Sequence, residues 1–313
     1  MARLFCLDSV MVDIVLRVSN LPMSGGDVLA SERLMTTGGG FNAMSAASRQ
    51  GVTAVYAGRL GHGPFSDLAR AALDHEGIAA PVEPDHERDV GTCVVLLEPN
   101  GERTFITANG AEATLRPSHL ETLGVRADDV VLISGYNVMY PGFAEMVLGW
   151  VAHLEGVLVA FDPATRLEDI PDEFLSPMLA RVDWLLCNRR EGAALSGAAT
   201  SREAASVLQG RYGRGVVIRD GERGCVVAAP GHDPQAVAGF STNIVDLNGA
   251  GDVHNGVFLA ELLRGATPDE ASRRANAAAA MAVATLGPAS GPTKAELDTW
   301  LRHATPSSDA GLS

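Results

Sequence analysis

Three small residues, Gly249, Ala250 and Gly251, separate an apolar segment ending at Val245 from a predicted helix. The apolar segment is typical of a strand, and a turn of small residues lets a ligand approach the backbone closely. The free N–H groups and the positive dipole end at the helix start would form an anion hole. The spacing therefore predicts a phosphate site.

Asp252 follows this anion hole in the first predicted helical turn. A bound phosphate repels a carboxylate, so Asp252 is a poor phosphate ligand. It is well placed to take a proton from an attacking hydroxyl. The helix dipole is expected to lower its pKa and keep it ionised at neutral pH. The alternative is an ordinary N-capping aspartate after a glycine turn.

A second glycine cluster, Gly38, Gly39 and Gly40, precedes a helix predicted from Ala43. Consecutive glycines permit close backbone approach, and Asn42 offers a donor and an acceptor, which suits sugar hydroxyls. The alternative is a flexible loop with an asparagine cap. The cluster lacks the Gly-x-Gly-x-x-Gly pattern of dinucleotide-binding folds, which is also not matched at 249–256.

Two weaker motifs lie where predicted strands end. Asn188 ends one strand and Glu191 enters the next helix, so both could face a metal-bound phosphate at the carboxyl edge of the sheet. The alternative is a simple capping pair. Arg219, Gly221 and Gly224 form a strand end followed by a glycine turn, for which a plain hairpin is the alternative.

Two arginines are candidates for an acidic acceptor. Arg166 lies just past a strand end, and Arg103 lies in a predicted hairpin. The chain has a net charge of −14, so an arginine in the pocket could select a carboxylate or phosphate on the substrate. The alternative for each is a solvated or salt-bridged arginine.

The basic residues exclude several mechanisms. Of 24 lysines and arginines, only Lys294 is a lysine. A P-loop and a protein kinase both need a lysine in a setting that Lys294 lacks, and Schiff-base chemistry has only this poor candidate. The acidic balance excludes a strongly basic nucleic-acid face and a polybasic membrane patch.

The elements that must position these residues alternate between strands and helices. Short apolar strands are expected at 4–7, 52–57, 130–134, 157–161, 184–187 and 215–219. Helices are expected between them, and later at about 248–264 and 268–286. This alternation predicts an α/β domain with a mainly parallel sheet. Two extended segments do not fit the alternation, and Pro99-Asn100-Gly101 predicts a hairpin in the second.

The expected organisation is therefore a core of 1–11, 37–87 and 109–303 and a small β lid of 12–36 and 88–108. We expect 304–313 to be a disordered tail. The first residues lack the apolar core of a signal peptide, and no run is long enough to span a membrane. The four cysteines are expected to be free and buried in a reducing cytoplasm.

Together, in this order, the four motifs resemble the ribokinase-like (PfkB-type) carbohydrate kinase family over nearly the whole chain, from Asp8 to about Pro292. Within the family the chain looks most like a poorly characterised sugar-kinase branch. The shared features are the segment 99–105, the Ser134-Gly-Tyr136 segment and the histidine at 254. The resemblance implies a three-layer α/β/α fold with a mainly parallel sheet and a β lid that often forms a homodimer interface.

The resemblance also implies roles. Asp252 would be the base, and the backbone of 249–252 the anion hole. The sugar would be bound by Asp13, Gly38, Gly39 and Asn42. Asn188 and Glu191 would act at the Mg²⁺–phosphate end through water. The rest of the ATP site would comprise Arg219, Gly221 and Gly224, with Asn276 at the adenine. Asp246 and the Asn248 carbonyl would lie at the monovalent-cation (K⁺) loop of many members.

Three positions depart from the family pattern. His254 replaces an aromatic residue, Asn248 replaces a threonine, and Thr37 replaces a glycine. On a helix His254 points largely away from Asp252, which favours packing over a proton shuttle. These departures bear on substrate identity more than on the chemistry.

The sequence thus predicts an ATP-dependent kinase acting on a hydroxyl of a sugar or sugar acid, with no nucleic-acid or membrane partner. The runner-up is a nucleoside kinase of the same family, which would want aromatic lid residues around a base. A non-catalytic sugar or nucleotide sensor would be expected to have lost Asp252. A dinucleotide-dependent oxidoreductase is disfavoured because the fingerprint is unmatched.

Overall fold

The computed structural model describes residues 2–285, 287 and 289–307. Its main sheet has eight strands in the order β12-β11-β10-β9-β8-β7-β1-β4. Neighbouring strands are parallel from β4 to β10, and β11 and β12 are antiparallel additions. The strands are β1 (Arg3–Leu7), β4 (Thr53–Tyr56), β7 (Val130–Ser134), β8 (Leu158–Asp162), β9 (Trp184–Asn188), β10 (Gly215–Arg219), β11 (Gly224–Ala228) and β12 (Gln235–Ala238).

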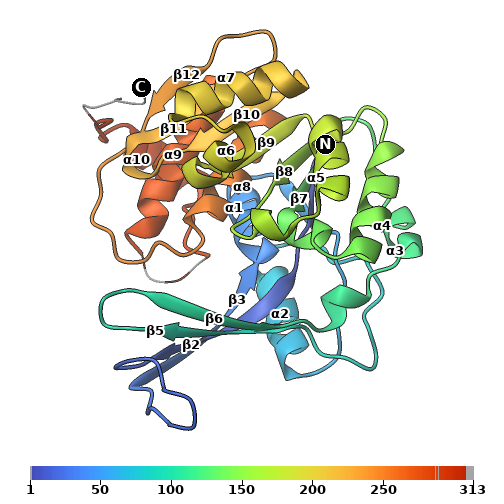
Figure 1. Ribbon diagram of the computed structural model, residues 1–313, viewed down its shortest axis with the longest axis vertical. Coiled ribbons are helices and arrows are strands. Elements are labelled where there is room, and N and C mark those ends of the chain that lie inside the picture. Colours follow the sequence, from blue (N-terminus) through green and yellow to red (C-terminus); the bar gives the residue numbers. More distant parts are fainter. Residues whose placement is uncertain (1, 286, 288, 308–313) are drawn as a thin grey trace.

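Helices cover both faces of this sheet (Figure 1). On β1, Leu4 and Cys6 join one buried cluster while Phe5 and Leu7 join the other, as expected when successive side chains point to opposite faces. The first cluster is covered by α1 (Gly40–Arg49), α2 (Pro64–His75), α8 (Ala250–Leu263), α9 (Pro268–Val283) and α10 (Lys294–Leu301). The second is covered by α3 (Pro117–Glu121), α4 (Pro141–Ala152), α5 (Asp172–Arg181), α6 (Arg189–Ser196) and α7 (Ser201–Tyr212). The result is the expected three-layer α/β/α domain.

A second sheet lies apart from the main one, in the order β3-β2-β5-β6. Its strands are β2 (Val10–Arg17), β3 (Glu32–Gly39), β5 (Thr92–Leu97) and β6 (Arg103–Ala108). Figure 1 shows it as a slab of blue and green strands beneath the main body. We call these four strands the lid. The strands reach beyond the lid segments expected at 12–36, since β2 begins at Val10 and β3 continues to Gly39. The division into core and lid units stays a prediction.

Two local expectations, the hairpin and the free buried cysteines, are confirmed. β5 and β6 form the antiparallel hairpin around Asn100-Gly101, and all four cysteines are free and buried. No helix in the described part of the chain is long and apolar enough to cross a membrane. Residues 304–307 are attached to the core, because Pro306 bridges Phe240 and the Ser307 N–H donates to the Gly239 carbonyl. The rest of the predicted tail, 308–313, lies outside the described residues.

Two local expectations are wrong. The first glycine-rich helix begins at Gly40 and not at Ala43. The second glycine-rich helix, α8, is not preceded by a strand that ends at Val245. The last strand before it is β12, and Val245 lies in a loop with 58% of its surface exposed. The apolar residues of that loop are not core residues, since Ile244 and Leu247 line a cavity. The strand predicted to end at Val245 is therefore wrong, because its apolar residues border a cavity and do not pack in the core.

Candidate functional site

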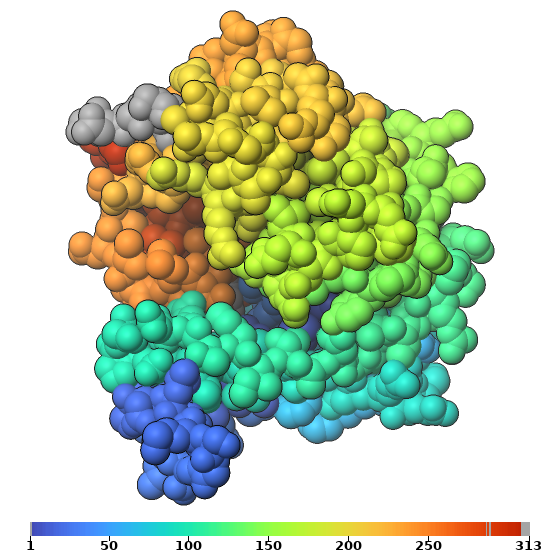
Figure 2. Space-filling view, viewed as in Figure 1, coloured from blue at the N-terminus to red at the C-terminus, as the bar shows by residue number. Residues whose placement is uncertain are grey.

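A cavity of about 1570 Å³ lies between the lid and the main sheet. Figure 2 shows the corresponding hollow between the lid and the yellow-green part of the core, with dark blue N-terminal atoms at its floor. Its lining includes one polar residue at or just past the carboxyl end of each of five parallel strands: Asp8, Ser134, Asp162, Asn188 and Arg219. Carboxyl ends of parallel strands are where α/β sheets bind ligands.

The turn at 249–251 opens α8 as predicted. Gly249 has φ 75°, a left-handed conformation that favours glycine, and the helix begins at Ala250. All three small residues line the cavity, and so does Asp252 in the first turn. The Ala250 N–H donates to the Leu247 carbonyl at 3.5 Å, whereas the N–H groups of Gly251 and Asp252, in the first turn, have no intrahelical acceptor. The predicted anion hole therefore lies at the cavity wall, and its binding of a phosphate stays a prediction.

Asp252 is held by the other glycine-rich helix. The Asn42 Nδ2 donates to Asp252 Oδ2 at 3.0 Å. The two helices approach each other so closely at Gly256 that a side chain there would not fit. A Cβ at Gly256 would lie 2.2 Å from the Ala43 carbonyl oxygen. Glycine at 256 thus brings the first turns of α1 and α8 together. The two motifs, 210 residues apart, form one site.

The pKa of Asp252 is raised to about 6, chiefly because burial disfavours its charge. The Asn42 hydrogen bond opposes this, the Asp162 carboxylate raises the pKa further, and Arg219 lowers it. The sequence-based expectation of a lowered pKa is therefore wrong in direction, because burial outweighs the helix dipole. Ionisation at neutral pH still follows, since a pKa of about 6 lies below 7.

Arg219 brings a cation to the anion hole. Its Nη2 lies 3.1 Å from Asp162 Oδ2, and its Nη1 donates to Asn255 Oδ1. Asn255 also donates to Asp162 at 2.6 Å, which closes a three-residue network. The Arg219 guanidinium carbon would lie 3.6 Å from a Cβ at Gly251. A phosphate at the helix start would therefore meet a fixed positive charge.

Asn188 and Glu191 form a reciprocal capping box at the start of α6. The Glu191 N–H donates to Asn188 Oδ1 at 3.0 Å, and the Asn188 N–H donates to Glu191 Oε2 at 2.8 Å. The pKa of Glu191 is raised by burial and by the Asp162 carboxylate. The alternative of a capping pair is thus realised, and both residues also line the cavity.

Glu191 and Asp162 fit a hydrated Mg²⁺ that is held through its waters, because their carboxylate oxygens already accept hydrogen bonds, Glu191 from Asn188 and Asp162 from Ala164, Asn255 and Arg219. Glu191 and Asp162 present two carboxylates whose mutual repulsion a divalent cation would relieve, and Mg²⁺ usually retains waters beside one or two carboxylates. Glu191 was predicted for this role through water. Asp162 was not singled out, although it directly follows the predicted strand at 157–161.

The predicted sugar side combines both sheets. Asp13 of β2 and Gly39 line the cavity, while Gly38 lies behind Asp13, where a Cβ would come within 2.4 Å of its Oδ2. Burial and the Asp252 charge raise the pKa of Asp13 to about 6, although the Arg103 charge lowers it. Thr37 Oγ1 and Asn42 Oδ1 are buried and find no hydrogen-bond partner among the residues that the structure describes. Neither Thr37 nor Asn42 is among the residues that line the cavity, so these two oxygens do not face a ligand there.

Asp8 is a residue that sequence reasoning missed. It lines the cavity, and burial together with the Asp252 charge raises its pKa to about 7. Its signal was available: like Asp162, it directly follows a predicted buried strand, at 4–7. The rule that ligands bind at strand carboxyl ends would have found both residues.

The two candidate arginines have protein partners. Arg166 lines the cavity and pairs with Asp169 at 2.6 Å, with 58% of its side chain exposed. Arg103 extends from β6 and pairs with Asp246 of the core. Each thus realises the salt-bridged alternative, and contact with an acceptor stays a prediction.

The predicted adenine side lies next to β12. Asn276 donates to the Val237 and Ala238 carbonyls at 3.0 and 3.1 Å, and His254 Nε2 lies 3.1 Å from Asn276 Oδ1. Burial and Arg219 lower the pKa of His254 to about 3, so its ring is neutral. A neutral ring engaged by Asn276 fits the packing interpretation. Gly221, Gly224 and Asn276 all line the cavity.

The predicted monovalent-cation loop does not fit a free cation. Asp246 Oδ1 accepts from Arg103 Nη2 and from the Asn248 N–H at 2.8 Å, and Oδ2 accepts from the Gly287 N–H at 3.2 Å. Both carboxylate oxygens are therefore already bonded. A K⁺ ion here would also meet the repulsion of the guanidinium.

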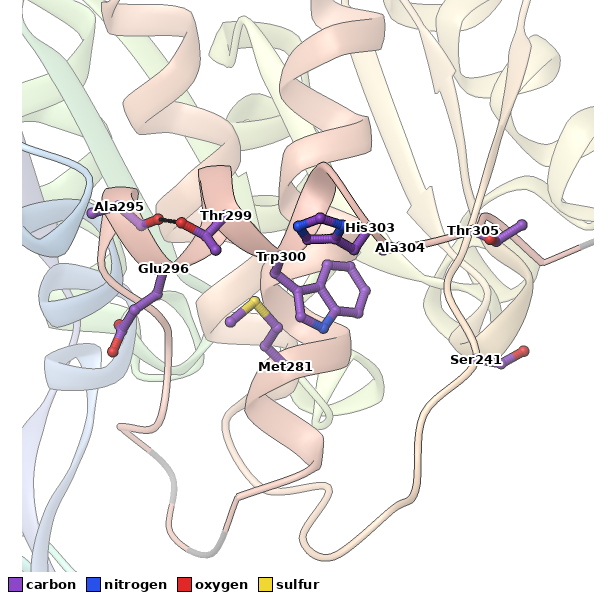
Figure 3. A pocket seen from close by; sticks show the side chains of 9 residues that line it. All are labelled: Ser241, Met281, Ala295, Glu296, Thr299, Trp300, His303, Ala304 and Thr305. Atoms are coloured by element: carbon purple, nitrogen blue, oxygen red, sulfur yellow. Dashed lines mark hydrogen bonds between the residues drawn. The ribbon is translucent and has the colours of Figure 1, made fainter.

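A smaller pocket of about 660 Å³ lies beside α9 and α10 (Figure 3). Met281 and Trp300 form its apolar part, and Ser241 and His303 lie at its rim. Trp300 also packs edge-on against Phe240, with ring centroids 5.1 Å apart. This pocket brings together none of the predicted site residues.

Known proteins resemble the chain over its whole described fold. Residues 1–295 match the family described as "pfkB family carbohydrate kinase". The uncharacterized sugar kinase YegV of Escherichia coli (strain K12) is 30% identical over 292 residues, covering 91% of this chain and 90% of the relative. Ribokinase from Thermotoga maritima superposes with a TM-score of 0.84 at 25% identity, covering 97% of this chain and 100% of that one. Arabidopsis thaliana ribokinase, complexed with ribose and ATP, shares the fold with a TM-score of 0.79 at 23% identity, over 96% and 99% of the two chains. The chain belongs to the pfkB family of carbohydrate kinases.

Proposed function

We propose that this carbohydrate kinase transfers the γ-phosphoryl group of ATP to a hydroxyl of a sugar. The observation that carries the proposal is the position of Asp252. It lies in the first turn of α8 beside the glycine-rich anion hole, and Asn42 orients its carboxylate. Ribose and ATP in the related Arabidopsis structure support this pair of substrates.

Each group of the site has a part in this reaction. Asp252 takes the proton of the acceptor hydroxyl as the hydroxyl oxygen bonds to the γ-phosphorus of ATP and the bond from that phosphorus to the β,γ-bridging oxygen breaks, which releases ADP. The N–H groups at the start of α8 and the Arg219 guanidinium stabilise negative charge on the transferred group. Asp13 and the backbone at Gly39 position the acceptor, and Asn42 holds the Asp252 carboxylate. Glu191 and Asp162 would hold Mg²⁺ through water, and the ion would neutralise charge at the phosphates.

The acceptor class is the finer part of the proposal. The carboxyl groups of Asp8 and Asp13 in the cavity lining favour a polyhydroxyl acceptor, and a sugar acid would require Arg166 to exchange Asp169 for the ligand. A nucleoside is the second candidate, because Phe105, Tyr136 and Tyr140 line the cavity with exposed rings on which a base could stack. An ATP-consumption screen of sugars, sugar acids and nucleosides separates the three classes.

Two further proposals concern assembly and location. The lid exposes apolar residues on its outer face, which suits a homodimer, and four buried free cysteines suit the reducing cytoplasm.

The decisive experiment is turnover of Asp252→Asn with the best acceptor. Asparagine keeps the shape and the hydrogen-bonding capacity of a helix cap but cannot accept the proton. We expect a folded enzyme with ATP affinity unchanged or slightly tighter, and kcat lower by about 10²–10⁴-fold. Asp67→Asn, at an exposed position in α2, is the control. Near wild-type kcat with chemistry limiting would identify Asp252 as a cap only.

A further inference from the structure

An ion pair connects the lid to the loop that precedes the anion hole. Arg103 is the first residue of β6, the edge strand of the lid, and its Nη2 binds Asp246 Oδ1. The two residues are 143 positions apart in the chain. Both side chains are largely buried, with 20% and 8% of their surfaces exposed. This is therefore not a solvated surface pair of little energetic effect.

Asp246 organises the loop that leads into α8. Its carboxylate binds the N–H groups of Asn248 and Gly287, and its own N–H donates to the Val283 carbonyl at 3.1 Å. Gly249, with its left-handed backbone, follows Asn248 directly and sets the first free N–H groups of the helix. The position of Asp246 thus determines how the anion hole is presented.

The geometry points to Arg103 as a built-in cation that positions the anion-hole loop through Asp246, in place of a free monovalent ion. We call Arg103 a positioning residue, because its described partner is Asp246 and not a reacting atom. The inference rests on the proposed phosphoryl transfer for its kinetic consequences. Its structural consequence, the order of the loop around Asp246, does not depend on that proposal.

The physical reason lies in charge and connectivity. Buried beside only two backbone N–H donors, the Asp246 carboxylate needs a positive partner. Although burial would raise its pKa, Arg103 and the backbone donors hold that pKa below its usual value. A guanidinium is charged at all relevant pH values and is covalently fixed, so it needs no dissolved ion. Because Arg103 belongs to the lid, the pair forms only when the lid lies against the core.

The first test is cation dependence at constant ionic strength, with KCl replacing tetramethylammonium chloride. We expect wild-type kcat/KM to change less than about twofold, below the usual range of coupling between sites. Arg103→Ala is expected to lose roughly 5- to 100-fold in kcat/KM without K⁺, and KCl should restore part of it. Arg103→Lys keeps a cation and should remain insensitive to K⁺.

The matched control is Arg17→Ala. Arg17 is also a lid arginine in an ion pair, but its partner Glu32 belongs to the neighbouring lid strand. Its removal takes away one positive charge without touching the core. We expect wild-type kinetics and no response to KCl.

The second test is hydrogen exchange, which needs no activity. The N–H groups of Asn248 and Gly287 both bind Asp246. We expect faster exchange at both positions in Arg103→Ala, slower exchange again when KCl is added, and no change in Arg17→Ala. If the wild type phosphorylated no acceptor, the proposed function would fail. The exchange rates at Asn248 and Gly287 would still decide whether Arg103 positions the loop.

Three results would overturn the inference. One is activation of the wild type by K⁺ beyond equal ionic strength, which requires no variant. The second is a defect in Arg103→Ala that K⁺ leaves unchanged, especially a raised acceptor KM alone, which would instead identify Arg103 as an acceptor-binding residue. The third is unaltered exchange at Asn248 and Gly287 in Arg103→Ala.

Discussion

Asn42 and Asp252 are joined by a 3.0 Å hydrogen bond in which the amide donates to the carboxylate. This bond stabilises the charged form of Asp252, whereas burial disfavours it. The proton affinity of the proposed base therefore depends on a residue from a different glycine-rich motif. The effect of Asn42 on the base can be measured separately from its predicted contact with the acceptor, since pH dependence reports the pKa and KM reports acceptor binding.

We expect kcat/KM of the wild type to rise with pH through about 6, because the base must be ionised and its pKa is raised to about 6. Asn42→Ala removes the hydrogen bond that lowers this pKa. The acid limb of the profile should therefore move to higher pH, whatever happens to KM. The measurement is kcat/KM for the acceptor from pH 5 to 9.

Ser45→Ala is the control for this prediction. Ser45 lies in the same helix, and its hydroxyl donates to the Asn42 carbonyl at 3.1 Å. The acid limb of the kcat/KM profile of Ser45→Ala should lie at the same pH as that of the wild type. An acid limb that stays in place in Asn42→Ala would show that another group titrates, and would separate Asn42 from the base.

The local part of this site could be predicted from the sequence. The glycine turn before Asp252 and the reciprocal pair of Asn188 and Glu191 depend on residues within a few positions of each other. Their chemistry can therefore be inferred from the local amino-acid sequence. The same applies to the hairpin at Asn100-Gly101, whose turn residues select its geometry.

The rest depends on contacts across the fold. Burial, which raises the pKa of Asp252, arises only when α1, α8 and the sheet pack together, so the local dipole argument gave the wrong direction. The partner of Arg103 is 143 residues away and could not be inferred from its neighbours. Val245 was expected in a strand because its apolar neighbours resemble core residues, although they border a cavity.

The lid offers a row of four apolar side chains at one register, each directly opposite the next: Met35, Ile14, Val94 and Ile106. They alternate with Asp13, Cys93, Phe105 and Thr107, which line the cavity, so the row lies on the other face. Ile106 is 59% exposed and Met35 37%. Ile106→Glu would bury a charge in an apolar dimer interface, and we expect at least about a tenfold rise in the dimer Kd.

Sedimentation velocity over a concentration series measures this change. Asn100→Glu is the control, because it adds the same charge at the exposed hairpin turn. A wild type that is monomeric at every concentration would remove the dimer proposal. An Ile106→Glu variant as dimeric as the wild type would place the interface elsewhere.

Asp8 makes the stability of the protein depend on pH. Burial and the neighbouring Asp252 raise its pKa from 3.8 to about 7 in the folded state. The folded protein therefore binds this proton more tightly than the unfolded chain. The resulting stabilisation is complete below the unfolded pKa and is lost as the pH rises through about 7. The full difference would correspond to about 4 kcal/mol, and contact of Asp8 with cavity water reduces it.

Asp8→Asn removes the charge while keeping the shape, so it should raise Tm relative to wild type at pH 8 and much less at pH 5. Both proteins share all other titrating groups, and the difference between their Tm values isolates Asp8. Asp67→Asn, at an exposed site in α2, should show no such pH-dependent difference. Thermal unfolding at the two pH values provides the measurement. The Tm difference between Asp8→Asn and wild type could instead be equal at the two pH values. Asp8 would then ionise as easily in the folded protein as in the unfolded chain. Its carboxylate would then be available to the acceptor in the charged form throughout the working pH range.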